Sequence, residues 1–329
     1  MGGPETLTSL RSKQVSRAVL NNIVWIIFIV LMVVFSVSIK GFLTADNYIN
    51  IIYHSVFIGI LAIAETFILI AGQIDLSIES TAACAAIISV WLCSSSPYAS
   101  GLLANTGIGF IVIVIIGILI GSFNAFFVVK LKINSFLVTL SSYIFVRALA
   151  VWITGGYGMN GLPGSFRFID TIKVLDIPMM VYFMFIMYIF FEFVLRRTRF
   201  GRHIYILGGN EMAARNFGIN VNSLIFKVFI LSSVIAAIVG WLMASRANGA
   251  VASMGKNYLF EVLAAVVIGG VSMSGGIGSL VGVFAGSLIL SSIHSALNIT
   301  AVSPFITDVI QGFLIIIAVS LDSLKRMFR

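Results

Sequence analysis

The chain has 329 residues, of which 60% are hydrophobic and only 10% are charged, and its mean hydropathy is +1.11. Soluble domains carry roughly 25% charged residues, so this composition excludes an ordinary soluble protein. The formal net charge is +8, and in a membrane protein such a basic excess mostly reports topology. We therefore expect an all-α, polytopic membrane protein that forms one transmembrane domain over residues 1–329.

Successive apolar runs are long enough, at about 1.5 Å per residue, to cross a hydrocarbon core of ~30 Å. The first run is too long for a cleaved signal core, so we predict a retained helix after a polar tail at 1–21. About ten spans are expected, at residues 22–39, 51–71, 78–94, 106–128, 135–154, 179–195, 224–244, 258–274, 277–297 and 304–322.

The basic residues predict the orientation of these spans. If the N-terminus is cytoplasmic, fourteen Lys and Arg residues fall on cytoplasmic segments and five on outer ones. Cytoplasmic loops of membrane proteins carry such an excess, so both termini are expected in the cytoplasm. The same orientation places the loop 196–223 inside and the loop 155–178 outside.

Two stretches interrupt the apolar runs, near 72–77 ("GQIDLS") and 269–278 ("GGVSMSGGIG"). The letters GQIDLS and GGVSMS (269–274) align without gaps, which suggests an internal duplication of the kind found in transporters. Asp75 or Ser77 can cap the helix that restarts after the first interruption. Interrupted helices are tolerated where they line a cavity, but close packing through small residues is an equal alternative, as the GxxxG spacings 117/121 and 282/286 suggest.

The polar segment "GGNEMAARNFG" (208–218) predicts a short helix in the basic loop. Asn210 suits the N-cap, Glu211 the positive helix end and Gly218 the C-terminal stop. About two turns are not stable alone, so this helix needs a partner. It is either a helix lying on the membrane surface or a knob that docks into a cytoplasmic protein.

Four stretches together resemble the permease subunits of bacterial ABC importers for monosaccharides, the ribose, galactose and arabinose permease family within the branched-chain amino acid permease superfamily. They are "TRFGRHIYILGGNEMAARNFGINV" (198–221), "GQIDLSIES" (72–80), "KINSFLVTL" (132–140) and "EVLAAVVIGGVSMSGGIGSLVG" (261–282). The resemblance implies an inner-membrane protein whose segment 208–218 couples it to an ATPase. The coupling candidates are Gly208, Gly209, Asn210, Glu211, Ala213, Ala214 and Gly218.

The resemblance also implies that this chain works together with separate partner proteins. No G-x-x-x-x-G-K-[ST] stretch is present to hold nucleotide phosphates, so ATP and Mg²⁺ are expected on a separate ATPase with two nucleotide-binding halves. A periplasmic or lipid-anchored sugar-binding protein, a second permease copy and membrane lipid complete the expected assembly. No cofactor, catalytic residue or nucleic acid is expected, and the scattered histidines and cysteines show no metal-ligand spacing.

Candidate residues for the substrate pathway lie at the interruptions and on the matched motifs: Glu65, Asp75, Ser77, Asn134, Phe136, Thr139, Gly269 and Gly270. Two residues depart from the family pattern, Gln73 in place of a glycine and Glu79 near a later one. A branched-chain amino acid permease is the nearest alternative. A proton-coupled secondary transporter that uses Glu65 or Asp75 and an intramembrane enzyme acting on lipid are more remote ones.

Glu65 and Arg147 are charges inside predicted spans. An unpaired charge at the centre of a span costs about 2.5–3.5 kcal/mol on insertion scales. We therefore expect the second and fifth spans to be neighbours, with the two side chains meeting or sharing a polar cavity. The alternative is that each is hydrated separately.

Overall fold

A computed structural model describes residues 23–303 and positions 306, 307, 309, 310, 312, 313, 316 and 320. The predicted tail at 1–21 lies outside the described residues, and the tenth predicted span is described only at those scattered positions. The helices are α2 (Ile23–Ser38), α3 (Ala45–Ile70), α4 (Ile78–Cys93), α5 (Thr106–Val129), α6 (Ser135–Thr154), α7 (Phe168–Thr171), α8 (Met179–Arg197), α9 (Arg199–Gly209), α10 (Glu211–Asn216), α11 (Val221–Ala247), α12 (Tyr258–Ile268) and α13 (Leu280–Ile299).

Among the described residues, six helices are long and apolar enough to cross a membrane, namely α3, α5, α6, α8, α11 and α13. Shorter apolar helices are α2, α4 and α12. The prediction of an all-α polytopic membrane protein is confirmed. The predicted eighth span, 258–274, is too long, because α12 ends at Ile268 after 11 residues, which is about 16 Å, or half of a hydrocarbon core.

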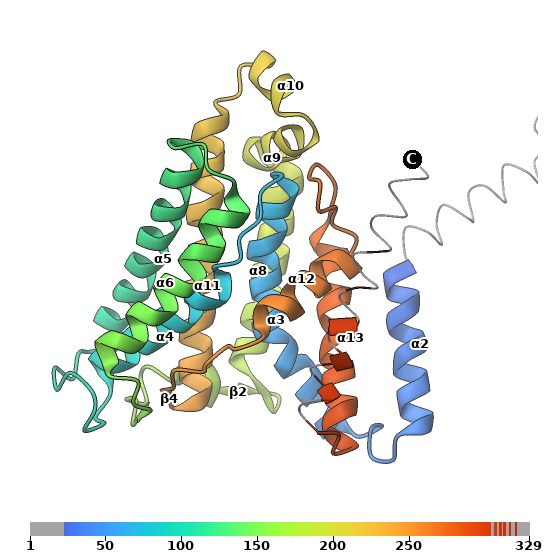
Figure 1. Ribbon diagram of the computed structural model, residues 1–329. Coiled ribbons are helices and arrows are strands. Elements are labelled where there is room, and N and C mark those ends of the chain that lie inside the picture. The colour runs from blue at the N-terminus through green and yellow to red at the C-terminus, as the bar shows by residue number, and fades with distance from the viewer. Residues whose placement is uncertain are drawn as a thin grey trace, which may run out of the picture.

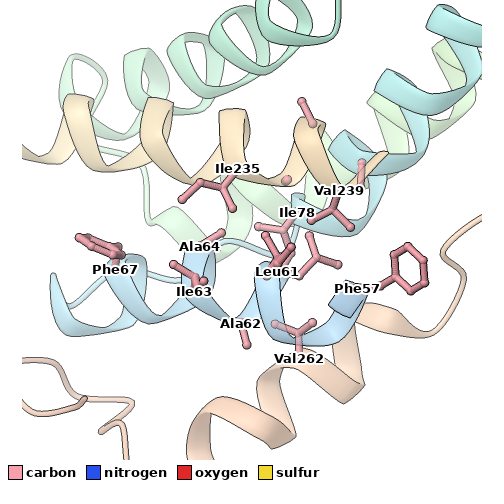
Figure 2. Close-up of a cluster of buried hydrophobic side chains, with 14 of the residues drawn as sticks. Phe57, Leu61, Ala62, Ile63, Ala64, Phe67, Ile78, Ile235, Val239 and Val262 are labelled. Atoms are coloured by element: carbon pink, nitrogen blue, oxygen red, sulfur yellow. The ribbon is translucent and has the colours of Figure 1, made fainter. Parts of the chain in front are cut away.

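Helix α3 is the central element of the bundle. Its most apolar window is 83% buried, against 33% in α5, 28% in α6 and 33% in α8. A helix that is apolar on all sides and enclosed by protein is a core helix, whereas the outer helices keep apolar faces for lipid. Figure 2 shows Leu61 and Phe67 of α3 among side chains from its neighbours, which include Ile235 of α11 and Val262 of α12.

Glycines bring the other helices into backbone contact with their neighbours. A Cβ at Gly117 or Gly121 of α5 would lie 2.7 Å from the Cα of Val234 or Ile230 in α11. A Cβ at Gly286 of α13 would lie 2.1 Å from the carbonyl oxygen of Ala265 in α12. The GxxxG spacings therefore mark close helix packing, as the packing interpretation predicted.

The two ends of the bundle carry different elements (Figure 1). Helices α9 and α10 lie at one end, and short strands lie at the opposite end. There β1 (Met159–Asn160) pairs antiparallel with β4 (Gly249–Ala250), and β2 (Lys173–Val174) pairs with β3 (Ile177–Pro178). The register Met159↔Ala250 ties the loop 155–178 to the turn that follows α11.

The expected pairing of Glu65 with Arg147 is wrong. Arg147 instead binds Glu79, with Nη2 2.6 Å from Oε1, because α6 packs against α4, which begins one residue before Glu79. The same guanidinium donates to the carbonyls of Ala252 at 2.9 Å and Met254 at 3.3 Å. Glu65 lies beside Asp75 instead, so the charge in α3 and the charge in α6 belong to separate sites.

The pair Glu79–Arg147 also fixes the start of the short helix α12. The second carboxylate oxygen of Glu79 accepts a hydrogen bond from the N–H of Leu259 at 3.1 Å. A carboxylate at a helix N-terminus is favoured by the unpaired N–H groups and by the helix dipole. The departure from the family pattern at Glu79 therefore has a structural role, since this side chain joins α4, α6 and α12.

We predict that Arg147→Met destabilises the protein by roughly 3 kcal/mol, because removal of one partner leaves the buried Glu79 carboxylate without its counter-charge. Thermal unfolding in detergent micelles measures the effect. Glu79→Gln added to Arg147→Met should recover most of the loss. Arg215→Met is the matched control, because its pair with Glu211 is exposed and should contribute less than about 1 kcal/mol. Equal losses in Arg147→Met and Arg215→Met would contradict the prediction.

Candidate functional site

The segment 208–218 forms the helix predicted for it; because the sequence predicts that it couples the chain to an ATPase, it is called the coupling segment from here on. Asn210 ends α9 and caps α10, since its Oδ1 accepts the N–H of Ala213 at 2.9 Å. Glu211 lies in the first turn of α10 and pairs with Arg215 at 2.7 Å. Gly218 follows the helix with φ +75°, a left-handed conformation that glycine adopts without a Cβ penalty.

Two large apolar side chains are exposed at α10, one within the helix and one on the residue directly after it. Met212 is 69% exposed and Phe217 is 77% exposed. Ala214, in contrast, is fully buried within the chain's own core, while Ala213 is half-buried. Of the two alanines, Ala214 therefore serves internal packing, and the surface open to a partner is carried by Met212 and Phe217.

Five glycines connect the coupling segment to both interrupted stretches, and we call them the glycine junction: Gly72, Gly208, Gly209, Gly275 and Gly276. The N–H of Gly276 donates to the carbonyl oxygen of Ile70 at 2.9 Å. A Cβ at Gly208 would lie 1.8 Å from that same oxygen and 2.6 Å from the nitrogen of Gly276. The end of α9 is therefore wedged between the end of α3 and the loop that joins α12 to α13.

A second contact reinforces this connection. The hydroxyl of Tyr205 in α9 donates to the carbonyl of Gly278 at 2.7 Å. Glu192 in α8 accepts the N–H of Leu280, the first residue of α13, at 3.0 Å. The loop between α12 and α13 is thus held on three sides by α3, α8 and α9.

The stretch 71–77 between α3 and α4 is held by side chains of three other helices. The N–H of Ile74 donates to Ser135 Oγ at 3.2 Å, and that of Leu76 donates to Thr139 Oγ1 at 3.0 Å. Non-helical backbone at membrane depth is tolerated only when such partners satisfy it. Hydroxyls at the start of α6 supply these partners here.

Asp75 lies at the centre of this stretch and is fully buried. Its Oδ1 accepts the N–H of Ser77 at 2.9 Å and the hydroxyl of Ser77 at 2.6 Å, and its Oδ2 accepts the hydroxyl of Ser232 at 3.4 Å. Asn124 of α5 donates to Ser77 Oγ at 2.8 Å. The carboxylate therefore bonds to the residue that precedes α4, in a local turn, rather than to the first turn of α4 itself.

The residues predicted for a pathway separate into three places. Asp75, Ser77 and Thr139, together with Ser135, Asn124 and Ser232, are called the buried polar cluster. Within it, Asp75, Ser77, Asn124 and Ser232 are joined by side-chain hydrogen bonds. Ser135 and Thr139 instead accept backbone N–H groups of the stretch 71–77. Glu65 borders it and faces Asp75 without a well-formed hydrogen bond to either of its oxygens.

The other candidates lie elsewhere. Asn134 caps α6 at the exposed end of that helix, where Phe136 is 43% exposed. Gly269 packs against α13, since a Cβ there would lie 2.5 Å from the Cα of Val283, and Gly270 is exposed with φ +88°. Sequence reasoning missed Asn124 and Ser232, although Asn124 is an isolated amide in an otherwise apolar run.

Comparisons with known proteins identify the family of this chain. Residues 47–319 match the family described as the branched-chain amino acid transport system permease component. The ribose import permease protein RbsC of Haemophilus influenzae is 31% identical over 314 residues, which cover 94% of this chain and 95% of that protein. The chain belongs to this permease family. The resemblance stated from the sequence motifs is confirmed.

Other relatives narrow the branch to which the permease belongs. RbsC of Bacillus subtilis is 32% identical over 302 residues, 90% of each chain. The L-arabinose transport system permease protein AraH of Escherichia coli is 32% identical over 301 residues, which are 92% of this chain and 90% of that protein. No solved structure matches the permease. The permease is thus a transporter subunit of the ABC sugar importer type and not an enzyme.

Gly208 and Gly209 offer a matched test of the glycine junction. Gly208→Ala should abolish transport or prevent folding, because the new methyl group would meet the backbone of Ile70 and Gly276, which cannot yield. Gly209→Ala should be tolerated, because a Cβ at Gly209 meets nothing within 4 Å. Yield, thermal stability and uptake of the two purified variants measure this difference. Normal function in Gly208→Ala would show that α9 is not wedged at this point.

Proposed function

We propose that this chain is the transmembrane permease subunit of an ATP-driven importer that passes a monosaccharide, a pentose or a hexose, into the cytoplasm. Two copies would surround one pathway in a bacterial inner membrane, with both termini cytoplasmic. The fourteen-to-five distribution of basic residues supports this orientation. The observation that carries the proposal is α10, a short capped helix with exposed Met212 and Phe217, at the end of the bundle predicted to be cytoplasmic.

The proposed coupling acts through backbone contacts. A cytoplasmic ATPase that receives Met212 and Phe217 would push or pull α10 as it closes on ATP. Asn210 links α10 directly to α9, and α9 ends at the glycine junction. Motion of α9 would therefore reach the end of α3 and the loop between α12 and α13 together, because Gly208 lies between them. Both interrupted stretches would then respond to one event at the ATPase.

We propose that the buried polar cluster belongs to the part of the permease that α9 would displace as a unit, and that it does not line a permanently open pathway. Asp75, Ser77 and Thr139 are all fully buried; Asp75 bonds to Ser77, and Thr139 bonds to backbone groups. A buried network of this kind holds a non-helical segment in one geometry. Asn134, Phe136 and Gly270, which are exposed, stay predictions for contact with the passing sugar.

A separate ATPase and a sugar-binding protein outside the membrane complete the proposed importer. The named relatives, which are ribose and arabinose permeases, support a sugar rather than a branched-chain amino acid as substrate. Selectivity among sugars would belong mainly to the binding protein, because a pathway that releases its substrate must bind it weakly.

Reconstitution tests this function directly. Vesicles containing the permease and its ATPase should take up a labelled pentose or hexose only with ATP and the binding protein present. Uptake should persist when a protonophore collapses the proton gradient. Uptake that needs the gradient and not ATP would instead establish a secondary transporter acting through Glu65 and Asp75. Uptake of leucine in place of sugars would establish the amino acid alternative.

The exposed face of α10 makes a sharper prediction. Met212→Asp with Phe217→Asp should leave the permease folded but reduce uptake and stimulated ATP hydrolysis at least tenfold, because two charges would enter an apolar docking surface. The matched control is Asn216→Asp, a change on the same short helix that replaces an already polar exposed residue. Co-purification of the ATPase measures docking. Full uptake by the Met212/Phe217 variant would show that α10 is not the docking helix.

A further inference from the structure

A basic cavity lies where α8 passes into α9. It has a volume of about 480 Å³ and is lined by Leu195, Arg196, Arg197, Arg202, Tyr205 and Gly278. Three of these six residues are arginines. A cavity of this charge selects an anionic ligand, and guanidinium groups bind phosphate oxygens in a bidentate manner.

Among the described residues, Arg196 is the one arginine of this cavity that forms a salt bridge. Glu192 is the carboxylate that pairs with Arg196, and it also accepts the N–H of Leu280 at 3.0 Å. Within the described part of the chain, no salt bridge is made by Arg197 or Arg202. The guanidinium of Arg202 donates to the backbone carbonyl of Arg197, at 3.1 Å. Two guanidinium groups thus remain available to a bound anion.

An apolar stripe leads from this cavity along α8. Ile186, Phe190 and Phe193 are 62%, 55% and 61% exposed, and together with Arg197 they follow one another at intervals of four, three and four residues. Residues at these intervals share one face of a helix. The stripe therefore runs along the lipid-exposed side of a membrane-spanning helix and ends at the unpaired arginine.

The geometry points to a site for an anionic phospholipid, whose phosphate headgroup occupies the arginine cavity while an acyl chain lies along Ile186, Phe190 and Phe193. Basic pockets at the cytoplasmic side of membrane helices bind such headgroups. A soluble phosphate would leave the stripe unused. The ATPase is a less suitable occupant, because α10 projects farther from the spans than α9 does (Figure 1) and the cavity lies at the α8–α9 corner.

Occupation of this site would affect the coupling segment. The headgroup would bridge Arg197 at the end of α8 and Arg202 in α9, and Tyr205 of the same cavity bonds to Gly278. A bound lipid would therefore restrict motion of the connection between α8 and α9, and α9 leads to the glycine junction. The assignment to the cytoplasmic leaflet rests on the orientation in the proposed function, whereas the binding itself does not.

Lipid binding to the purified permease–ATPase complex tests this site. Phosphatidylglycerol and phosphatidylcholine are titrated in neutral detergent, with native mass spectrometry and thermal stability as readouts. Phosphatidylglycerol should bind at least about tenfold more tightly, and Arg197→Gln with Arg202→Gln should remove that preference, since each basic group near an anionic surface contributes about one kcal/mol, or roughly a factor of five. Arg197→Lys with Arg202→Lys should retain part of it.

The charge-matched control is Lys130→Gln with Lys132→Gln, which removes two exposed basic residues outside the cavity. Its affinity for phosphatidylglycerol should stay within about twofold of the parent. An equal loss of phosphatidylglycerol affinity in both double variants would show that general surface charge causes the binding, and it would overturn the proposed site. Protection by millimolar inorganic phosphate equal to that by the lipid would establish a soluble-anion site instead. Loss of the ATPase from the arginine variant with unchanged lipid binding would make the cluster an ATPase contact. None of these readouts requires transport, so the site can fail independently of the proposed function.

Discussion

Backbone groups inside a membrane must find hydrogen-bond partners within the protein, and this constraint shapes the permease around α3. Where α3 ends, the chain leaves regular helical structure after its C-cap Ala71 and regains it only when α4 begins at Ile78. Ser135 and Thr139 accept two of the N–H groups that have no helical partner, and the Ile70 carbonyl accepts the N–H of Gly276. These partners come from α6 and from the loop between α12 and α13, so an interruption in one helix is stable only while the others surround it.

The same constraint explains why α9 reaches the core of the bundle. A carbonyl that has lost its helical partner attracts a donor, and the donor at Ile70 belongs to a loop more than 200 residues later in the chain. Gly208 fits beside this bond only because it has no side chain. The contact is made between backbone atoms, so no flexible side chain lies between them that could change rotamer when α9 moves. A movement of α9 would therefore be transmitted rather than damped.

Charges inside the bundle are used to hold half-length elements. α12 has only 11 residues and cannot span a bilayer, so its N-terminus lies where free N–H groups are costly. Glu79 supplies an acceptor there, and Arg147 balances the charge of Glu79 while bonding to two carbonyls of the preceding loop. Glu65 and Asp75 form a separate buried pair near the interruption after α3. Both of these groups of charges thus lie next to a break in regular structure.

Interactions between residues close together in the sequence determined where the helices of this protein begin and end. Apolar runs separated by polar turns predicted the helices, because hydrocarbon admits few other structures for one chain. Asn210 and Gly218 predicted the bounds of α10, since capping depends on residues within a few positions of one another. The GxxxG spacings in α5 and α13 predicted close helix packing, because residues four apart lie on one face of a helix. The four motifs identified the family.

Tertiary structure alone decided which distant groups meet. The partner of Arg147 is Glu79 rather than Glu65, because α4 and not α3 lies against α6, and no spacing along the chain contains that neighbour relation. Ala214 faces inward although its sequence position resembles that of Ala213, since burial depends on what packs beside a helix. Gly269, directly after the end of α12, packs against the backbone of α13 at Val283, a contact that the spacing along the chain does not contain. Long-range contacts of this kind set the site, whereas short-range preferences set the elements that carry it.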